Sequence, residues 1–499
     1  MSKRLYYSTS SLAAPHMGVV IDDILDAQEK GDEVYWTYCH TALSSCWVNP
    51  DGFNCICNFC HRLYCEYQRV YGTNIHMIPI QKPSIKHVRE VPDFKNADEL
   101  KNLTYRNVEI GNSILSMYYT STRDLDLTRF TEFHDFAIPL IGEIYDLIDT
   151  AYNLLKQIAP DIIIIHNGRL YENRLFYDIA KATGIRFKAI ETVGGHGEPY
   201  AKISYQNELP HNINMWDRMI KALWENSPET KEEKCKIASS FYEKRRKGEL
   251  VVDVKVYVAE QVKGLLPKNF DSNKRNIAIY TSSQDELAAL GRDTNSCQLF
   301  PNQSETVQYI FTHSPSNIHY YLRIHPNLKG INYKDHLELY KFASLPNVTV
   351  IPPESKISSY ALIDACEKVI SFGSSVGVEA SYWGKPSILI GHSAYEGLDA
   401  CYVVTKKEDI VPLIKKFLSP KSKLGSLMYA YFLLDRKYKT DKTHIDIGVQ
   451  TKKFFKWDFT YTSYFKLHKS TILYQLSYFW NCIILRHFTK PTLLFPWKA

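Results

Sequence analysis

The sequence has no long apolar run, since no stretch approaches the roughly 18 consecutive apolar residues that a membrane-spanning helix needs. Its first residues, MSKRLYYSTSSLAAPHMG, also lack the continuous apolar core of a signal peptide. We therefore expect the chain to stay in the cytoplasm. There is no Lys/Arg-rich tract or RNA-binding signature, and a net charge of +6 is too small to indicate nucleic acid as a partner. That mild excess of positive charge suits an anionic ligand or an anionic membrane surface.

Cysteine is present without the regular spacing of a disulfide framework. The 11 cysteines are irregularly spaced, and in a cytoplasmic protein we expect thiols or metal ligands rather than disulfides. Only one C-x2-C pair occurs, formed by Cys57 and Cys60. With Cys46 and Cys55 nearby, it could supply four thiolates to a structural zinc ion. An iron–sulfur cluster and a set of buried free cysteines are the alternatives.

What the sequence does have is a repeated alternation of β-rich runs and amphipathic segments, which is typical of α/β domains built on parallel sheets. A chain of 499 residues is too long for one core and suggests two domains of roughly 200 residues each. We expect an N-terminal domain over residues 1–206 and a helical connector over 207–275. A C-terminal domain over 276–440 and a tail over 441–499 follow.

In the N-terminal domain the clearest strand is Ile162–Ile165, four consecutive isoleucines that indicate burial on both faces of a sheet. Loops at the C-terminal ends of parallel strands gather ligands. One such loop is expected over residues 10–18, before a helix at 19–30, and a further helix is expected over 108–119. The acceptor-side candidates in these loops are His16, Gly18, Asn167 and Arg169.

The C-terminal domain is organised around residues 369–389, VISFGSSVGVEASYWGKPSIL. The run predicts a strand, a turn at Gly373, a helix and a second strand, which together form one βαβ unit. A helix that begins after the small residues Ser374 and Ser375 presents backbone N–H groups to an anion such as phosphate. Glu379, about one turn into the helix, could reach a ribose hydroxyl. The alternative is an ordinary tight turn with an N-capping serine.

Two more loops of this domain follow expected strands and supply hydroxyl, carboxylate, guanidinium and imidazole groups. Their candidate donor-binding residues are Ser282, Ser283, Glu286, Arg323 and His325. Because the C-terminal ends of parallel strands lie at one edge of a sheet, we expect these loops near the turn at Gly373. The combined set is chemically suited to the phosphate and ribose of a sugar nucleotide.

Several of these segments resemble a known family. LRIHPN, YTSSQDELAALG and ISFGSSVGVEASYWGKPSILIG are similar to the bacterial capsule and surface-polysaccharide biosynthesis glycosyltransferases of the GT-B fold, and HMGVVIDDIL and NVEIGNSILSMYYTSTRD extend the likeness to the N-terminal half. The HP pair and the paired serines are also similar to bacterial sialyltransferases and Kdo transferases, which use CMP-activated sugars. The resemblance implies that His325, Ser374 and Ser375 bind the donor. It also implies an α/β protein with two Rossmann-like domains that face a cleft.

An inverting transfer needs a base near the acceptor hydroxyl. The candidates are Glu191, His196, Asp124, Glu198 and His16. The resemblance selects none of them, and a retaining enzyme could work without such a base. No Asp-x-Asp pair follows an expected strand, and Asp22 and Asp23 lie inside an expected helix. We therefore expect transfer that requires no metal cofactor.

The tail over 441–499 is dense in aromatic and basic residues, and Leu473, Leu476 and Trp480 fall on one helical face. We expect an amphipathic helical segment on the inner face of the cell membrane, and the alternative is a helix that packs back onto the domains.

The predicted function is transfer of a sugar from a CMP- or UDP-type nucleotide donor to a glycan or lipid-linked acceptor of a capsule or O-antigen. A CDP-polyol phosphotransferase of the teichoic-acid type would share this donor chemistry. A non-catalytic scaffold of a polysaccharide assembly complex is the third hypothesis.

Overall fold

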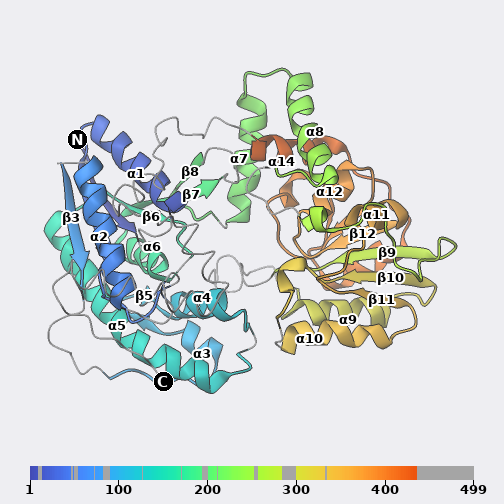
Figure 1. The fold of residues 1–499 in the computed structure, drawn as a ribbon, viewed down its shortest axis with the longest axis horizontal. Coiled ribbons are helices and arrows are strands. Elements are labelled where there is room, and N and C mark those ends of the chain that lie inside the picture. The colour runs from blue at the N-terminus through green and yellow to red at the C-terminus, as the bar shows by residue number, and fades with distance from the viewer. Residues whose placement is uncertain are drawn as a thin grey trace. The chain divides into compact units, whose positions relative to one another are not determined.

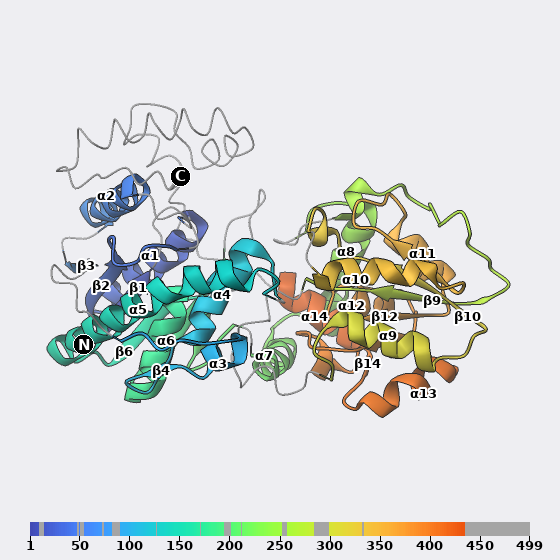
Figure 2. The same cartoon turned by 90° about the horizontal axis from the view of Figure 1, so that it is seen from below.

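A computed structural model of the chain describes residues 1–8, 14–46, 49, 54–71, 74–81, 90–125, 127–169, 171–193, 201–210, 212–251, 257–283, 299–331 and 334–434. The chain divides into two compact units. Unit 1 comprises the described residues of Met1–Thr122 and Arg129–Pro210, and unit 2 comprises those of Arg123–Thr128 and His211–Lys437. Figures 1 and 2 label most of the helices and strands of each unit.

Unit 1 contains a six-stranded sheet with the strand order β3-β2-β1-β6-β7-β8. Its strands run parallel except for β8, which pairs antiparallel with β7. Counted along the chain this order is 3-2-1-4-5-6, the order of Rossmann folds. The strands are β1 (Lys3–Ser8), β2 (Glu33–Cys39), β3 (Ile75–Ile80), β6 (Ile162–His166), β7 (Arg186–Val193) and β8 (Ala201–Gln206).

Helices cover both faces of this sheet (Figure 2). Successive residues of a strand point to opposite faces. Accordingly, Tyr6 of β1 packs in the core beneath α1, whereas Tyr7 stacks on Phe176 of α6 with ring centroids 3.8 Å apart. The helices are α1 (Ala14–Glu29), α2 (Asn54–Tyr71), α3 (Ala97–Lys101), α4 (Gly111–Thr122), α5 (Phe130–Ile158) and α6 (Tyr171–Thr183).

Unit 2 repeats the architecture with the strand order β11-β10-β9-β12-β13-β14, and all of its pairings are parallel. This order is again 3-2-1-4-5-6 along the chain. The strands are β9 (Arg275–Tyr280), β10 (Ile318–Arg323), β11 (Val348–Ile351), β12 (Lys368–Ser371), β13 (Ser387–Leu389) and β14 (Tyr402–Val403).

The core of unit 2 has two layers because the apolar strands are buried on both faces. Ile277 and Ile279 of β9 pack with residues of α9, α10 and α13, whereas Ala278 and Tyr280 pack with residues of α11 and α12. The helices are α7 (Ile213–Asn226), α8 (Lys231–Lys247), α9 (Gln303–His313), α10 (Lys334–Lys341), α11 (Ser359–Ala365), α12 (Val376–Tyr382), α13 (Ile410–Lys415) and α14 (Lys423–Leu434). Helices α7 and α8, from the expected connector, both pack against α14 within this unit.

The two Rossmann-like α/β sheets confirm the predicted fold class, and the cleft between the domains stays a prediction. Two boundaries were predicted wrongly. Helix α1 begins at Ala14 instead of residue 19, because Pro15 needs no N–H partner in a first helical turn. The expected helix over 108–119 begins only at Gly111, because Val108–Glu109 pairs as strand β5 with β4 (Thr104–Tyr105).

Among the described residues, no helix combines the length and the apolar character needed to cross a membrane. The expected amphipathic tail over 441–499 lies outside the described residues.

Candidate functional site

The sheet of unit 2 has a topological switch point between β9 and β12. From β9 the chain continues to β10 and β11 on one side, and from β11 it crosses back to β12 on the other side of β9, followed by β13 and β14. Open α/β sheets bind their ligands at this place, outside the C-terminal ends of the strands. The three loops predicted to bind the donor follow β9, β10 and β12, and the strand order makes these neighbours in the sheet.

The loops after β9 and β10 are tied together by Thr281, whose hydroxyl accepts the backbone N–H of His325 at 2.8 Å. Ser282 donates its backbone N–H to Gln303 Oε1 at 3.0 Å, and its hydroxyl accepts from Gln303 Nε2 at 3.0 Å. Ser283 is half-buried beside it, whereas Glu286 lies outside the described residues. The predicted serines therefore lie on a loop that α9 holds in place.

His325 caps the short helix Pro326–Leu328 that follows β10. Its Nδ1 accepts the backbone N–H of Asn327 at 3.2 Å, so the neutral ring carries its proton on Nε2. The ring is half-buried and lies edge-on to Tyr257, with centroids 5.5 Å apart. A fixed Nε2–H donor at a strand end is the kind of group that meets a phosphate oxygen.

Arg323 is 2% exposed, and burial lowers its pKa. Its guanidinium donates to the backbone carbonyls of Ile357 at 2.7 Å and Ser355 at 3.3 Å. These bonds hold the segment before α11 against the end of β10. The contact of Arg323 with a donor phosphate stays a prediction.

The turn after β12 requires glycine at position 373. Gly373 has φ +100°, and a Cβ there would lie 2.5 Å from the carbonyl oxygen of His392. The next residue is pinned by two hydroxyls, since the carbonyl of Ser374 accepts from Tyr395 Oη at 2.6 Å and from Ser371 Oγ at 3.1 Å. The half-buried Ser374 and Ser375 are thereby held at the start of α12.

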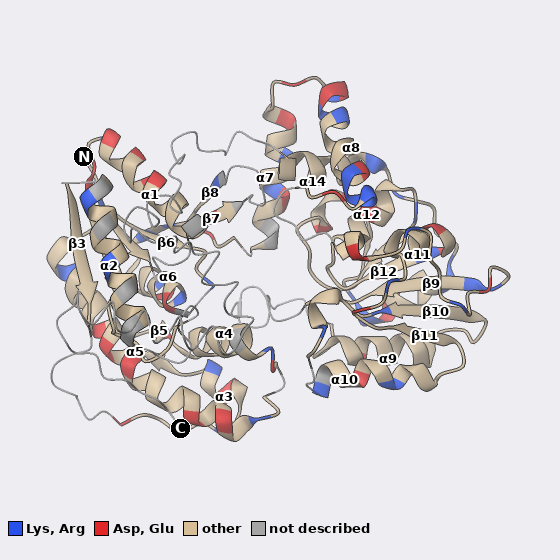
Figure 3. Ribbon diagram, in the orientation of Figure 1, with Lys and Arg blue, Asp and Glu red and all other residues tan. Residues whose placement is uncertain are grey.

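Glu379 is used inside unit 2. Its Oε1 lies 2.9 Å from Nη2 of Arg245 and accepts from Ser375 Oγ at 2.9 Å, and Tyr360 donates to its Oε2. Burial alone would raise the pKa of Glu379, but Arg245 and these hydroxyls outweigh burial and hold the pKa below its usual value. Arg245 belongs to the basic last turn of α8 (Figure 3) and also donates to Ser375 at 3.3 Å. The contacts of Arg245 and Glu379 with Ser375 thus hold the Ser374–Ser375 turn in place. The contact of Glu379 with a ribose hydroxyl stays a prediction.

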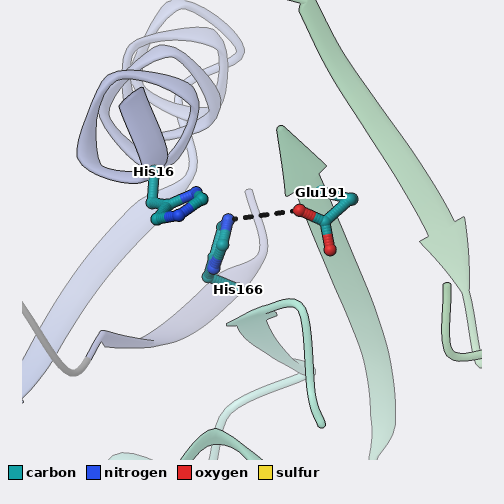
Figure 4. A group of neighbouring side chains, drawn as sticks. All are labelled: His16, His166 and Glu191. Atoms are coloured by element: carbon teal, nitrogen blue, oxygen red, sulfur yellow. Dashed lines mark ion pairs between the residues drawn. The ribbon is translucent and has the colours of Figure 1, made fainter. Parts of the chain in front are cut away.

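Unit 1 has its own switch point, between β1 and β6, and three titratable side chains meet there (Figure 4). His16 comes from the first turn of α1, His166 ends β6, and Glu191 lies near the end of β7. The two imidazole rings lie 4.3 Å apart, and His166 Nε2 is 3.7 Å from Glu191 Oε1. Both rings contact the hydroxyl of Thr192, at 3.0 Å from His16 Nδ1 and 3.2 Å from His166 Nε2.

Burial sets the protonation of this cluster. It lowers the pKa of both His16 and His166 to about 3, so both imidazoles are neutral at pH 7. Burial also raises the pKa of Glu191. Asn167, in the left-handed conformation with φ 62°, donates its side-chain amide to Glu191 Oε2. Three predicted residues thus come together with His166, which the sequence analysis missed. The sequence feature that could have identified His166 is its position as a polar residue directly after the apolar strand Ile162–Ile165.

The remaining predicted residues lie elsewhere or outside the described chain. Gly18 is buried within α1, and Arg169 lies after β6, where its carbonyl accepts from Ser116 Oγ at 2.9 Å. Asp124 is fully buried, and its Oδ1 closes a turn by accepting from the backbone and hydroxyl of Thr128. His196 and Glu198 lie outside the described residues.

The cysteines predicted to bind zinc lie on and before α2. Cys46 forms an isolated bridge with Asn49, and Cys57 and Cys60 lie on α2. Burial raises the pKa of Cys46 well above its usual value, which opposes thiolate formation in the absence of a metal. The side chain of Cys55 is not among those described, so a four-cysteine zinc site stays a prediction.

No protein-family model matches the chain, and no curated protein matches it. Among solved structures, the chain is similar to the β-Kdo 2,4 transferase KpsC of Thermosulfurimonas dismutans, with a TM-score of 0.36, 13% identity and coverage of 54% of this chain and 79% of that one. It is also similar to the spinosyn rhamnosyltransferase SpnG, with a TM-score of 0.25, 10% identity and coverage of 87% and 96%. A UDP-GlcNAc 2-epimerase from Methanocaldococcus jannaschii gives a TM-score of 0.26, 11% identity and coverage of 87% and 100%. Because these TM-scores and sequence identities are low, the assignment of function depends on the chemistry of the two sites.

Proposed function

We propose that the protein is a glycosyltransferase that moves a sugar from a nucleotide-activated donor, of the CMP or UDP type, to a growing surface polysaccharide. The observation that carries this proposal is the switch point of unit 2. There, the loops after β10 and β12, the two strands that flank β9, carry an oriented imidazole at His325, a glycine turn at Gly373 and the paired serines Ser374 and Ser375. These groups are hydrogen-bond donors, which are suited to the phosphate of a nucleotide.

The chemistry of transfer explains why such groups are needed. As the bond from sugar to phosphate breaks, negative charge develops on the departing nucleotide, and fixed donors that meet this charge lower the barrier. His325 can donate from Nε2, because its Nδ1 already accepts from Asn327. The Ser374 hydroxyl and backbone N–H groups of the turn would share the remaining charge, since the Ser375 hydroxyl already donates to Glu379. We propose that this donor site needs no metal ion.

The acceptor side is proposed to lie at the switch point of unit 1. An acceptor hydroxyl must lose its proton as it attacks the sugar. Among the base candidates that the structure describes, Glu191 and His16 lie in one cluster, where the predicted acceptor-side residue Asn167 donates to Glu191. Glu191 is proposed as the base of this pair. The acceptor is a glycan or a lipid-linked glycan, and the protein would meet it in the cytoplasm at the inner face of the membrane.

A donor screen tests the proposal. The purified protein is incubated with radiolabelled CMP-, UDP- and GDP-sugars or CDP-glycerol, together with polysaccharide and lipid-linked acceptors. Label transferred from a sugar nucleotide, and lost in the His325→Ala variant, is the expected result. Label transferred from CDP-glycerol alone would instead show a polyol phosphotransferase. Unchanged glycan production in cells that carry only His325→Ala would support a scaffold.

A further inference from the structure

The His16, His166 and Glu191 cluster has the composition of a metal site. We propose that these three side chains bind one divalent transition-metal ion of the zinc class at the switch point of unit 1 (Figure 4). Each side chain offers one ligand atom, and these atoms all lie within 4.8 Å of one another. In the part of the chain that the structure describes, this is the only such group of three His, Cys, Asp or Glu residues.

The distances suit a shared ion. Imidazole nitrogens and carboxylate oxygens lie about 2.0–2.2 Å from zinc, so two ligands at a tetrahedral angle are about 3.4 Å apart. His166 Nε2 and Glu191 Oε1 are 3.7 Å apart, which needs only a small adjustment. His16 Nδ1 and His166 Nε2 both face the Thr192 hydroxyl, at 3.0 and 3.2 Å. An ion at this point requires that hydroxyl to turn aside or to become a fourth ligand.

The ligands are also largely shielded from water. The side chains of His166 and Glu191 are 8% and 20% exposed, and a cation bound between them would compensate the charge of a carboxylate that lies mostly inside the fold.

A second layer of contacts holds the carboxylate. Asn167 donates to Glu191 Oε2, and the backbone N–H of Thr192 donates to Glu191 Oε1 at 2.9 Å. Outer contacts of this kind fix the orientation of metal ligands, and their loss typically lowers metal affinity about 10–100-fold. Asn167 is therefore assigned as a positioning residue for the ion.

The ligand set indicates the class of ion. Two nitrogens and one carboxylate are borderline ligands that suit zinc, cobalt, manganese or ferrous iron, whereas magnesium and calcium prefer oxygen alone. Binding of the ion does not depend on the proposed transferase activity. A catalytic role of the ion rests on that proposed activity. In that role the ion would lower the pKa of an acceptor hydroxyl, and Glu191 would hold the ion instead of acting as the base.

Cobalt titration tests the proposal, because Co²⁺ is a spectroscopic stand-in for zinc. The full chain is stripped with a chelator and titrated with Co²⁺ while its visible absorption is followed. We expect one equivalent to bind, without the near-ultraviolet charge-transfer band of a cobalt–thiolate bond, since the cysteines near α2 are the competing ligands. Glu191→Gln, which keeps the side-chain shape, and His166→Ala should each lower affinity by about 100-fold or more, and Asn167→Ala by about 10–100-fold.

The matched control is His313→Ala, which removes an exposed histidine of α9 and should bind cobalt as the wild type does. Thermal unfolding of each variant establishes that the fold is retained. The proposal is overturned if the wild type binds no cobalt, if the spectrum shows thiolate ligation, or if binding survives in Glu191→Gln and His166→Ala. None of these results would affect nucleotide binding by unit 2, so the transferase proposal is tested separately.

Discussion

Replacing Arg245 with methionine should destabilise unit 2 by about 3 kcal/mol at pH 7. Arg245 and Glu379 form an ion pair with side chains 8% and 3% exposed, so the substitution leaves an uncompensated carboxylate in the interior. Loss of one partner of a buried pair typically costs about 3–5 kcal/mol. The lower end applies here because Tyr360 and Ser375 still donate to Glu379.

The penalty should depend on pH in a defined direction. In the wild type the pKa of Glu379 is held below its usual value, so the pair stabilises the fold above the unfolded-state pKa of about 4.3 and loses this contribution as the pH falls through the folded-state pKa. Without Arg245, burial dominates and raises the pKa of Glu379. The folded variant then binds the extra proton, so its penalty is largest at neutral pH and shrinks as the pH falls toward about 4.3.

Urea unfolding at neutral and acidic pH measures this penalty, and hydrogen exchange of peptides from α8 and α12 assigns it to unit 2. Arg246→Met is the matched control. The neighbouring Arg246 pairs with Asp364 near the surface, with side chains 31% and 48% exposed, so its loss should cost less than about 1 kcal/mol. Equal stability of the two variants at both pH values would refute the ion-pair account.

Three further changes have defined outcomes. Gly373→Ala should destabilise the protein by more than about 1 kcal/mol and weaken nucleotide binding, because alanine is strained at φ +100° and its Cβ would meet a backbone carbonyl. Denaturation measures the loss of stability, and calorimetry measures the loss of binding. Lys188→Met removes a buried partner of Asp23 but leaves Lys202 at 3.3 Å, so denaturation should show a smaller loss than for Arg245→Met. His325→Ala should weaken nucleotide binding about tenfold or more, measured by calorimetry, and lower the unfolding midpoint only slightly, because a single helix-capping hydrogen bond is lost.

The sheet architecture could be predicted from the sequence because it follows from local patterns. The four isoleucines of Ile162–Ile165 form β6, and the glycine turn at Gly373 separates β12 from α12, as their local chemistry indicates. Two kinds of feature could not be predicted. The partner of Glu379 is Arg245, 134 residues away in the chain, so only the folded packing reveals the pair. His166 follows an apolar run, and only the parallel pairing of β1 with β6 explains its position beside His16.

The donor site in unit 2 is tested most directly by nucleotide binding to the wild type and to Ser374→Asp. Thermal unfolding is followed with CMP, CDP, UDP and GDP, because a ligand at about 100 times its Kd stabilises a protein by about 2.7 kcal/mol. One of these nucleotides should stabilise the wild type. Ser374→Asp should unfold normally without ligand and show no stabilisation, since its carboxylate would repel the phosphate. Stabilisation of Ser374→Asp to the same extent as the wild type, or no response of the wild type to any nucleotide, would contradict a donor site at this turn.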